Sequence, residues 1–138
     1  MKRLLFVVIC LLALVPLGAM ISSAQTKTSQ IARGKYLVEQ VGMCIDCHTP
    51  RNEKGELVKE KWLQGSTIEF KPIHPMPWSE VAPGIAGLPG WKEADFIKLM
   101  TTGVTAEGQP LRPPMPPYRM NDADARAVAA YLKSLKSK

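Results

Sequence analysis

Cys44-Ile45-Asp46-Cys47-His48 is the stretch that decides how this chain folds. Two cysteines three positions apart, followed directly by a histidine, form the attachment signature of a c-type haem. Each thiol can add to one vinyl group of the porphyrin, and the two thioethers then fix the ring to the backbone. The imidazole of His48 is placed to bind the iron from one face. The sequence therefore predicts a covalently attached haem held by Cys44, Cys47 and His48.

A pair of cysteines three positions apart also occurs in thioredoxin-like redox sites and as half of a zinc site. A thioredoxin site follows a strand, and no alternating strand pattern precedes Cys44. A structural zinc site needs four ligands, and the nearest additional candidate is His74, in a proline-rich stretch. The pattern thus favours haem over zinc or a plain dithiol.

The N-terminal residues have the layout of an export signal. A positively charged start is followed by the apolar run Leu4–Val15 and by small residues ending at Ala24. This predicts a signal peptide at residues 1–24 and a single domain at residues 25–138. The alternative is an uncleaved membrane anchor, because Leu4–Ile21 is 18 residues without a charge. Either reading predicts an exported, periplasmic protein, soluble or tethered to the inner membrane.

Charge and cysteine usage agree with export. The formal net charge is +6, and loss of the two charges of Lys2 and Arg3 would leave +4. With Cys10 in the N-terminal segment and the other two cysteines used for haem, no thiol remains for a disulfide. A covalently held apolar cofactor would then supply the stability that small exported domains usually take from disulfides. The basic surface fits solvated helix ends or steering toward an acidic redox partner. Nothing resembles a nucleic-acid-binding module.

Apolar spacing predicts a helix on each side of a long irregular region. Ser29 is the predicted N-cap of the first helix, and Gly42 is its predicted C′ residue. The apolar face of that helix comprises Ile31, Gly34, Leu37, Val38 and Val41. From Thr49 to Gly90, frequent proline and glycine exclude long helices and central strands. An irregular stretch of this length is expected to wrap a ligand.

Two further helices are predicted in the second half of the chain. One spans Trp91 to Thr102 and stops at Gly103, and its start has no good cap. The last begins after the N-cap Asn121 and runs to about Lys136, with acidic residues in its first turn.

A proline-rich loop between these helices carries the predicted sixth ligand of the iron. In Pro110-Leu111-Arg112-Pro113-Pro114-Met115-Pro116-Pro117-Tyr118, five prolines flank one methionine. Such a segment can also be a polyproline ligand for a partner or a rigid linker. Given the haem motif, we expect Met115 to bind the iron opposite His48, because His/Met ligation is common in electron-transfer cytochromes c. Three other candidates are weaker: Met100 and Met120 fit packing positions, and His74 would give a bis-His site.

These motifs together resemble class I c-type cytochromes, and more narrowly the monohaem domains of cytochrome c subunits of periplasmic sugar, alcohol or aldehyde dehydrogenases. The resemblance runs through nearly the whole predicted domain. It is carried by Arg33-Gly34-x-Tyr36-Leu37, Cys44 through Pro50, Leu63-x-Gly65, Trp91 with Phe96, Gly103 with Gly108, Leu111, Met115-Pro116, Asp122-x-Asp124 and Ala130-Tyr131-Leu132.

The resemblance implies an all-α fold, with three main helices and long loops wrapped round one covalently attached haem. It also implies an electron carrier rather than an enzyme, with a dehydrogenase or oxidase as redox partner. The first and last helices are expected to cross where Gly34 meets Tyr131. A departure from the family between Met76 and Pro89 leaves the propionate contacts open. The candidate donors are Arg51, Arg112, Trp62, Trp78 and Trp91. Alternatives are a haem enzyme or sensor with an open or His74-ligated sixth position, and an anchored subunit of a dehydrogenase or oxidase complex.

Overall fold

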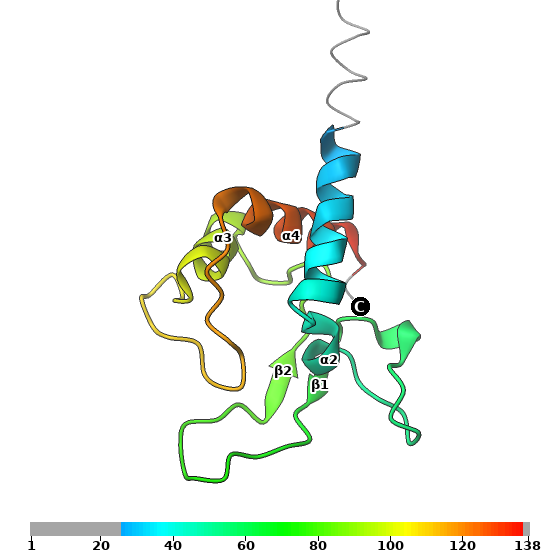
Figure 1. Cartoon of the computed structure of the whole chain (residues 1–138), viewed down its shortest axis with the longest axis vertical. Helices are drawn as coiled ribbons and strands as arrows, with labels where there is room; N and C mark the ends of the chain where they lie inside the picture. Colours follow the sequence, from blue (N-terminus) through cyan, green and yellow to red (C-terminus); the bar gives the residue numbers. More distant parts are fainter. Residues whose placement is uncertain (1–25, 137–138) are drawn as a thin grey trace, which may run out of the picture.

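The first helix covers residues 26–36 and continues without a break into a π-helical turn, η1, at Leu37–Val41 (Figure 1). The computed structural model describes residues 26–136, so the predicted signal peptide 1–24 and its cleavage site lie outside the described residues. The predicted N-cap is wrong, because Ser29 lies inside the helix. Its hydroxyl donates back to the Thr26 carbonyl at 2.8 Å, a bond that a serine within a helix commonly makes.

The π-turn also corrects the predicted end of this helix. The Gly42 N–H donates to the Leu37 carbonyl at 2.7 Å, which closes a wider turn than the α-helix and takes in one extra residue. Gly42 therefore keeps a right-handed conformation, with φ −82°, and is not the left-handed C′ residue that we expected. Met43 takes the left-handed conformation instead, with φ 46°, and the chain enters helix α2 at Cys44–His48.

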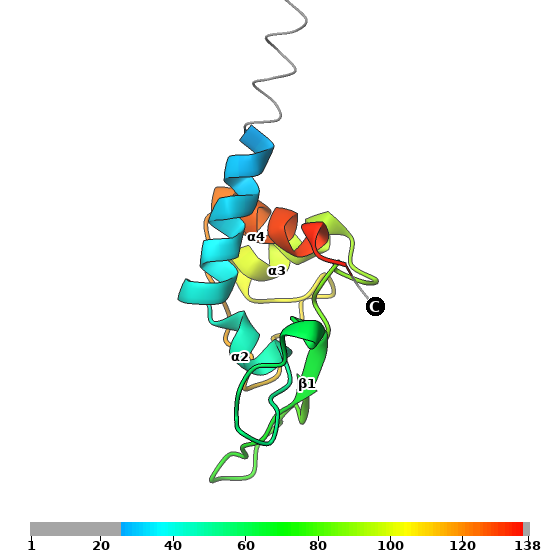
Figure 2. The same cartoon turned by 90° about the vertical axis from the view of Figure 1, so that its right-hand side faces the viewer.

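The first helix crosses the last one, α4 (Asp122–Ser134), at a point where no side chain fits between them (Figures 1 and 2). A Cβ added to Gly34 would lie 2.6 Å from the Ala127 carbonyl carbon and 2.8 Å from Tyr131 Cβ. The predicted contact of Gly34 with Tyr131 is thereby confirmed. The predicted cap of α4 is also confirmed, because Asn121 Oδ1 accepts the Asp124 N–H at 2.8 Å.

Helix α3 (Glu93–Thr102) packs beside α4 and completes the helical layer. It ends at Gly103, whose φ of 74° is the left-handed stop that the sequence predicts. It begins two residues later than predicted, after Lys92, which makes no side-chain capping bond. Across the pair, Lys133 of α4 forms an exposed ion pair of 2.7 Å with Glu93. An exposed pair of this kind contributes little stability, so burial of apolar surface holds α3 to α4.

A short hairpin lies below the helices, in the region predicted to be irregular. Strand β1 (Gly65–Thr67) pairs antiparallel with β2 (Val81–Pro83), and α2 lies against both strands (Figure 1). Strands of three residues give too short an alternation to recognise in a sequence, so this hairpin was not predicted. The 3₁₀ turn Lys59–Lys61 (η2) precedes it, and residues 68–80 connect its strands in a loop that extends away from the helices.

Leu63 connects the haem motif to the hairpin region. It is fully buried at φ 56°, and its N–H donates to Thr49 Oγ1 at 2.9 Å. Its carbonyl accepts the N–H groups of Ile85 and Ala86 at 2.8 and 3.0 Å. Three hydrogen bonds at one buried residue fix the segment before β1 and the segment after β2 against the end of α2.

The described residues form a mostly helical small domain with one two-stranded hairpin, in agreement with the predicted cytochrome c fold. Its core joins the first helix, α3, α4 and the loop around Leu63. Within residues 26–136, no helix is both long and apolar enough to cross a bilayer.

Candidate cofactor-binding site

Helix α2 brings the three predicted attachment residues to one side of the chain. Positions 44, 47 and 48 are three and four residues apart, so their side chains leave the helix on one face. Cys44 and His48 are buried and Cys47 is half-buried. Both cysteines are free thiols, as attachment through two thioethers requires. Burial raises the pKa of the Cys44 thiol to about 11, so its protonated form prevails at neutral pH.

The orientation of His48 is set by a backbone carbonyl from strand β2. His48 Nδ1 lies 2.7 Å from the Pro83 oxygen. A carbonyl only accepts, so Nδ1 must carry the proton and Nε2 is left with a free lone pair. Burial also lowers the pKa of His48, which favours the neutral imidazole. A neutral ring with one nitrogen fixed by a carbonyl and the other available is the arrangement of a metal-binding histidine.

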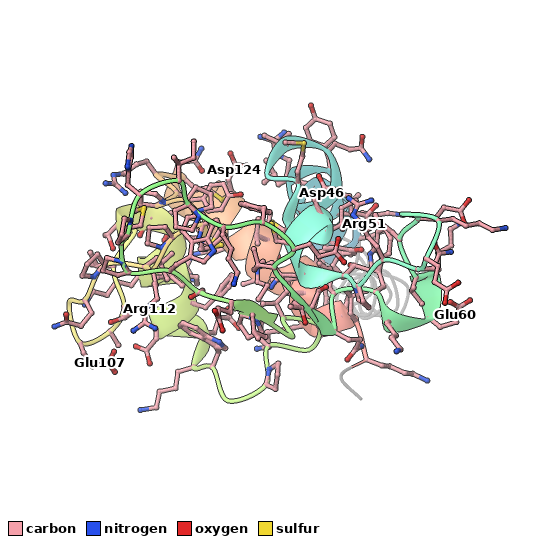
Figure 3. All side chains as sticks on the ribbon, turned by 90° about the horizontal axis from the view of Figure 1, so that it is seen from below. Asp46, Arg51, Glu60, Glu107, Arg112 and Asp124 are labelled. Atoms are coloured by element: carbon pink, nitrogen blue, oxygen red, sulfur yellow. The ribbon has the colours of Figure 1, made fainter. Side chains whose placement is uncertain are left out.

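Of the two variable residues of the motif, Ile45 packs against the core and Asp46 lies at the protein surface. Asp46 forms an ion pair of 3.1 Å with Arg51, and Arg51 also donates to the Gly55 carbonyl at 2.8 Å (Figure 3). The Arg51 guanidinium thus already makes hydrogen bonds to α2 and to the turn that follows it. These contacts make it a poor choice among the candidate propionate donors.

Met115 lies half-buried in the proline-rich loop, and the hairpin connects this loop to His48. The Pro113 carbonyl accepts the Ser79 N–H at 2.7 Å, shortly before β2. The same strand ends at Pro83, which holds His48. One continuous segment, residues 79–83, therefore contacts His48 and the loop that carries Met115.

The other sulphur and imidazole candidates occupy less suitable positions. Met100 is buried in the core of α3, with 2% of its surface exposed. Met120 is half-buried and packs against the core, while His74 is exposed in the loop between the strands. The positions of Met100 and Met120 agree with their predicted packing roles.

Trp78 is distinguished from the other candidate donors by a buried N–H without a partner. Among the described residues, its Nε1 is the one buried side-chain nitrogen or oxygen that makes no hydrogen bond. The Trp62 Nε1, by comparison, donates to Glu39 Oε1 at 3.3 Å, and Arg112 is exposed. A buried unpaired donor costs free energy, so an acceptor from outside the polypeptide is expected at Trp78.

The zinc alternative has no ligand set in the described part of the chain. Within residues 26–136, no group of three or more His, Cys, Asp or Glu side chains is arranged to hold a metal ion. The geometry around His48, with one ring nitrogen on a carbonyl and two thiols on the same helical face, instead fits a metal carried within a covalently bound ring.

Sequence comparison decides between these interpretations. A sequence model of the cytochrome c family matches residues 31–136, which is most of the chain. The chain belongs to the cytochrome c family. Membership implies a covalently bound haem of the c type, and the thiols, the oriented imidazole and the unpaired Trp78 N–H of this cytochrome fit that group.

The curated relatives of this cytochrome are longer proteins. A dihaem cytochrome c-type protein of Cereibacter sphaeroides is 36% identical over 73% of the chain and 34% of its own length. The fructose dehydrogenase cytochrome subunit of Gluconobacter japonicus is 30% identical over 77% of the chain and 22% of its own length. The cytochrome c subunit of a quinone alcohol dehydrogenase of Gluconobacter oxydans is 32% identical over 77% of the chain and 24% of its own length. The chain thus spans about a third or less of these relatives.

Sequence reasoning missed Pro83 as the partner of His48. A backbone carbonyl is present at every residue, so no residue type marks the one that will accept this bond. Glu39 was also missed: it accepts the Tyr131 hydroxyl as well as the Trp62 N–H, and so joins the first helix to α4 and to the loop after η2. The only available signal was its place one turn before the motif, which is not specific.

Proposed function

We propose that this chain is an exported electron-transfer protein that carries one haem c with His48 and Met115 as axial ligands. The observation that carries the proposal is the Pro83 carbonyl on His48 Nδ1, because it leaves Nε2 as the ligand atom in a buried position. One C-x-x-C-H motif occurs in the chain, which supports a single haem.

Haem c supplies an iron that exchanges one electron between its ferrous and ferric states. The polypeptide contributes the rest. Cys44 and Cys47 would anchor the ring to α2, and His48 would bind from the side braced by β2. A thioether from Met115 would favour the ferrous state and raise the reduction potential. If His48 and Met115 both bound the iron, no position would remain at the metal for a substrate, which supports a carrier over a haem enzyme.

The names of the relatives support a dehydrogenase as the redox partner, since two of them are cytochrome subunits of a fructose and an alcohol dehydrogenase. We propose that electrons pass from such an enzyme to this protein in the periplasm. The predicted export signal supports that location, whether residues 1–24 are removed or remain as a tether.

The proposal is tested by the spectrum of the protein made together with haem-maturation machinery. We expect a pyridine haemochrome of the c type, one haem per chain, and colour that stays with the polypeptide after denaturation. The ferric protein should show the weak near-infrared band of a methionine–iron bond and should bind no carbon monoxide when reduced at neutral pH. A colourless product would refute haem attachment, and rapid carbon monoxide binding would indicate an open sixth position.

The unpaired N–H of Trp78 is proposed to donate to a haem propionate. Replacement of Trp78 by phenylalanine removes this donor but keeps a ring next to Phe70, which Trp78 contacts edge-on at 5.7 Å between centroids. We expect the free energy of unfolding of the haem-loaded protein to fall by about 1.5–3 kcal/mol, the usual worth of a hydrogen bond to a charged group. Denaturant unfolding followed by far-UV circular dichroism measures it.

Trp91→Phe is the matched control for this experiment. Trp91 also makes an edge-on ring contact, with Phe96 at 5.9 Å, and its side chain is 39% exposed. Its substitution is expected to change the free energy of unfolding by roughly 0.5 kcal/mol or less. Equal effects of the two substitutions would show that the Trp78 N–H has no acceptor on the cofactor.

A further inference from the structure

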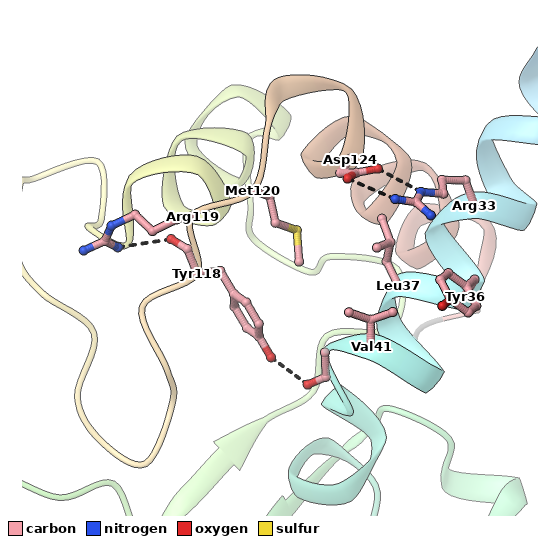
Figure 4. A pocket seen from close by; sticks show the side chains of 9 residues that line it. Arg33, Tyr36, Leu37, Val41, Tyr118, Arg119, Met120 and Asp124 are labelled. Carbon is pink, nitrogen blue, oxygen red and sulfur yellow. Dashed lines mark hydrogen bonds and ion pairs between the residues drawn. The ribbon is translucent and has the colours of Figure 1, made fainter.

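Tyr118 joins the loop that carries Met115 to the turn that precedes the haem motif. Its hydroxyl donates to the Gly42 carbonyl at 2.6 Å, across 76 positions of the chain (Figure 4). Gly42 lies between the π-turn and Cys44, so the contact holds the loop against the start of α2. The bond is partly buried, and burial raises the pKa of the tyrosine, so its hydroxyl stays protonated and able to donate.

The glycine at position 42 leaves room for this contact. A Cβ added there would lie 3.2 Å from the Tyr118 hydroxyl oxygen and 3.3 Å from Cys44 Sγ. Both atoms therefore lie directly beside the same backbone position. Since Gly42 has a right-handed conformation, close approach of Tyr118 and Cys44 explains the glycine better than backbone freedom does.

After its first residue, Pro110, which pairs with Val104 in an antiparallel bridge, the loop around Met115 is held to other segments by hydrogen bonds at three points. The Pro113 carbonyl accepts the Ser79 N–H at 2.7 Å, and the Met120 N–H donates to the Met100 carbonyl at 3.0 Å. The third hydrogen bond is the one from the Tyr118 hydroxyl to the Gly42 carbonyl. Because a side chain forms it, a substitution can remove it. Pro114, Pro116 and Pro117 have no N–H to donate, so the contacts on either side of Met115 must fix its position.

The ring of Tyr118 also borders an open groove of about 450 Å³ next to the first helix. In Figure 4 the ring lies below Met120 and across from the helix side chains Leu37 and Val41, and its hydroxyl reaches the Gly42 carbonyl. The groove means that the ring is not enclosed on that side. The hydroxyl bond, rather than packing alone, then determines where the aromatic ring and the loop behind it lie.

We propose that Tyr118 is a positioning residue that keeps Met115 on the iron by clamping its loop to Gly42. The inference rests on the proposed function, specifically on Met115 as the sixth ligand. Loss of the hydroxyl leaves the loop attached through Pro113 and Met120. It releases Tyr118 from the turn at Gly42, which precedes the haem motif. Transient release of Met115 then becomes more frequent, while the helical core remains as it is.

The experiment measures how readily added imidazole replaces Met115 in the ferric, haem-loaded protein. Loss of the near-infrared methionine–iron band is followed against imidazole concentration and time in the wild type, Tyr118→Phe and Tyr36→Phe. Tyr36 is the control because it is 52% exposed and lies in the first helix beside Arg33. For Tyr118→Phe we expect imidazole to bind roughly two- to tenfold more tightly and faster, which corresponds to one hydrogen bond of ordinary net strength. Tyr36→Phe should match the wild type.

The outcomes separate this inference from the proposed ligation. If Tyr118→Phe only lowers the denaturant midpoint and leaves imidazole capture unchanged, Tyr118 is structural and the inference fails while Met115 ligation stands. If the wild type lacks the methionine–iron band, or keeps it in Met115→Ala, the proposed ligation itself fails and the inference falls with it. An intact wild-type band with faster capture in Tyr118→Phe alone supports both.

Discussion

Met115→Ala is expected to abolish the near-infrared methionine–iron band and to lower the reduction potential on the order of 0.1 V or more, within the roughly 0.8 V range that axial ligands span. The reason is that a thioether stabilises ferrous iron, and water or an added ligand in its place does so less. Spectroelectrochemistry of the purified, haem-loaded protein measures both effects. The ferrous variant should also bind carbon monoxide, because its sixth position becomes accessible.

Met76→Ala is the matched control for this substitution. Met76 is 49% exposed in the loop between the strands, and its replacement should leave the band and the potential as in the wild type. His74→Ala examines the remaining alternative. A wild type without the band, whose spectrum changes in His74→Ala and not in Met115→Ala, would establish a bis-His centre and contradict the proposed ligation.

Gly34→Ala is expected to destabilise the protein by about 2 kcal/mol or more, even though alanine is the better helix former. The added methyl group would be pressed against the Ala127 carbonyl and Tyr131 Cβ, which belong to the opposing helix. A backbone carbonyl cannot rotate aside, so the first helix and α4 must separate. Thermal unfolding of the haem-loaded ferric protein should show a midpoint lowered by roughly 5–15 °C.

Ala32→Gly is the control that separates the stability effect of the helix crossing from the effect of helix propensity. Ala32 is exposed in the same helix, and glycine there should cost about 1 kcal/mol through propensity alone. Propensity by itself would therefore make Gly34→Ala stabilising by a similar amount. A higher midpoint for Gly34→Ala would mean that the helices do not cross as closely as the structure indicates.

Features with a local chemical cause were predictable from the sequence. The cap at Asn121 depends on a side chain reaching an amide three residues away, and the stop at Gly103 depends on one left-handed residue. The crossing at Gly34 was predictable because glycine inside a helix is unfavourable unless another chain segment approaches closely. Family resemblance supplied its partner, Tyr131.

Features that depend on backbone register or on long-range contacts were not predictable. The sequence predicts a left-handed conformation at Gly42, but the π-turn uses an extra position and Met43 has that conformation instead. Serine is common at N-caps, so the sequence predicts one at Ser29, but the helix already includes residue 26. Among the candidate donors, Trp78 was distinguished only when the contacts of Arg51 and Trp62 were known.

Residues 79–83 brace both sides of the proposed redox centre, through the Ser79 N–H on Pro113 and the Pro83 carbonyl on His48. If His48 and Met115 bind the iron as proposed, this shared support would limit how far the two ligands can move independently when the iron changes its charge. In an electron carrier, such stiffness keeps the reorganisation energy small, which favours rapid exchange with a partner at modest driving force. The same five residues would then affect the rate of electron exchange as well as the orientation of His48.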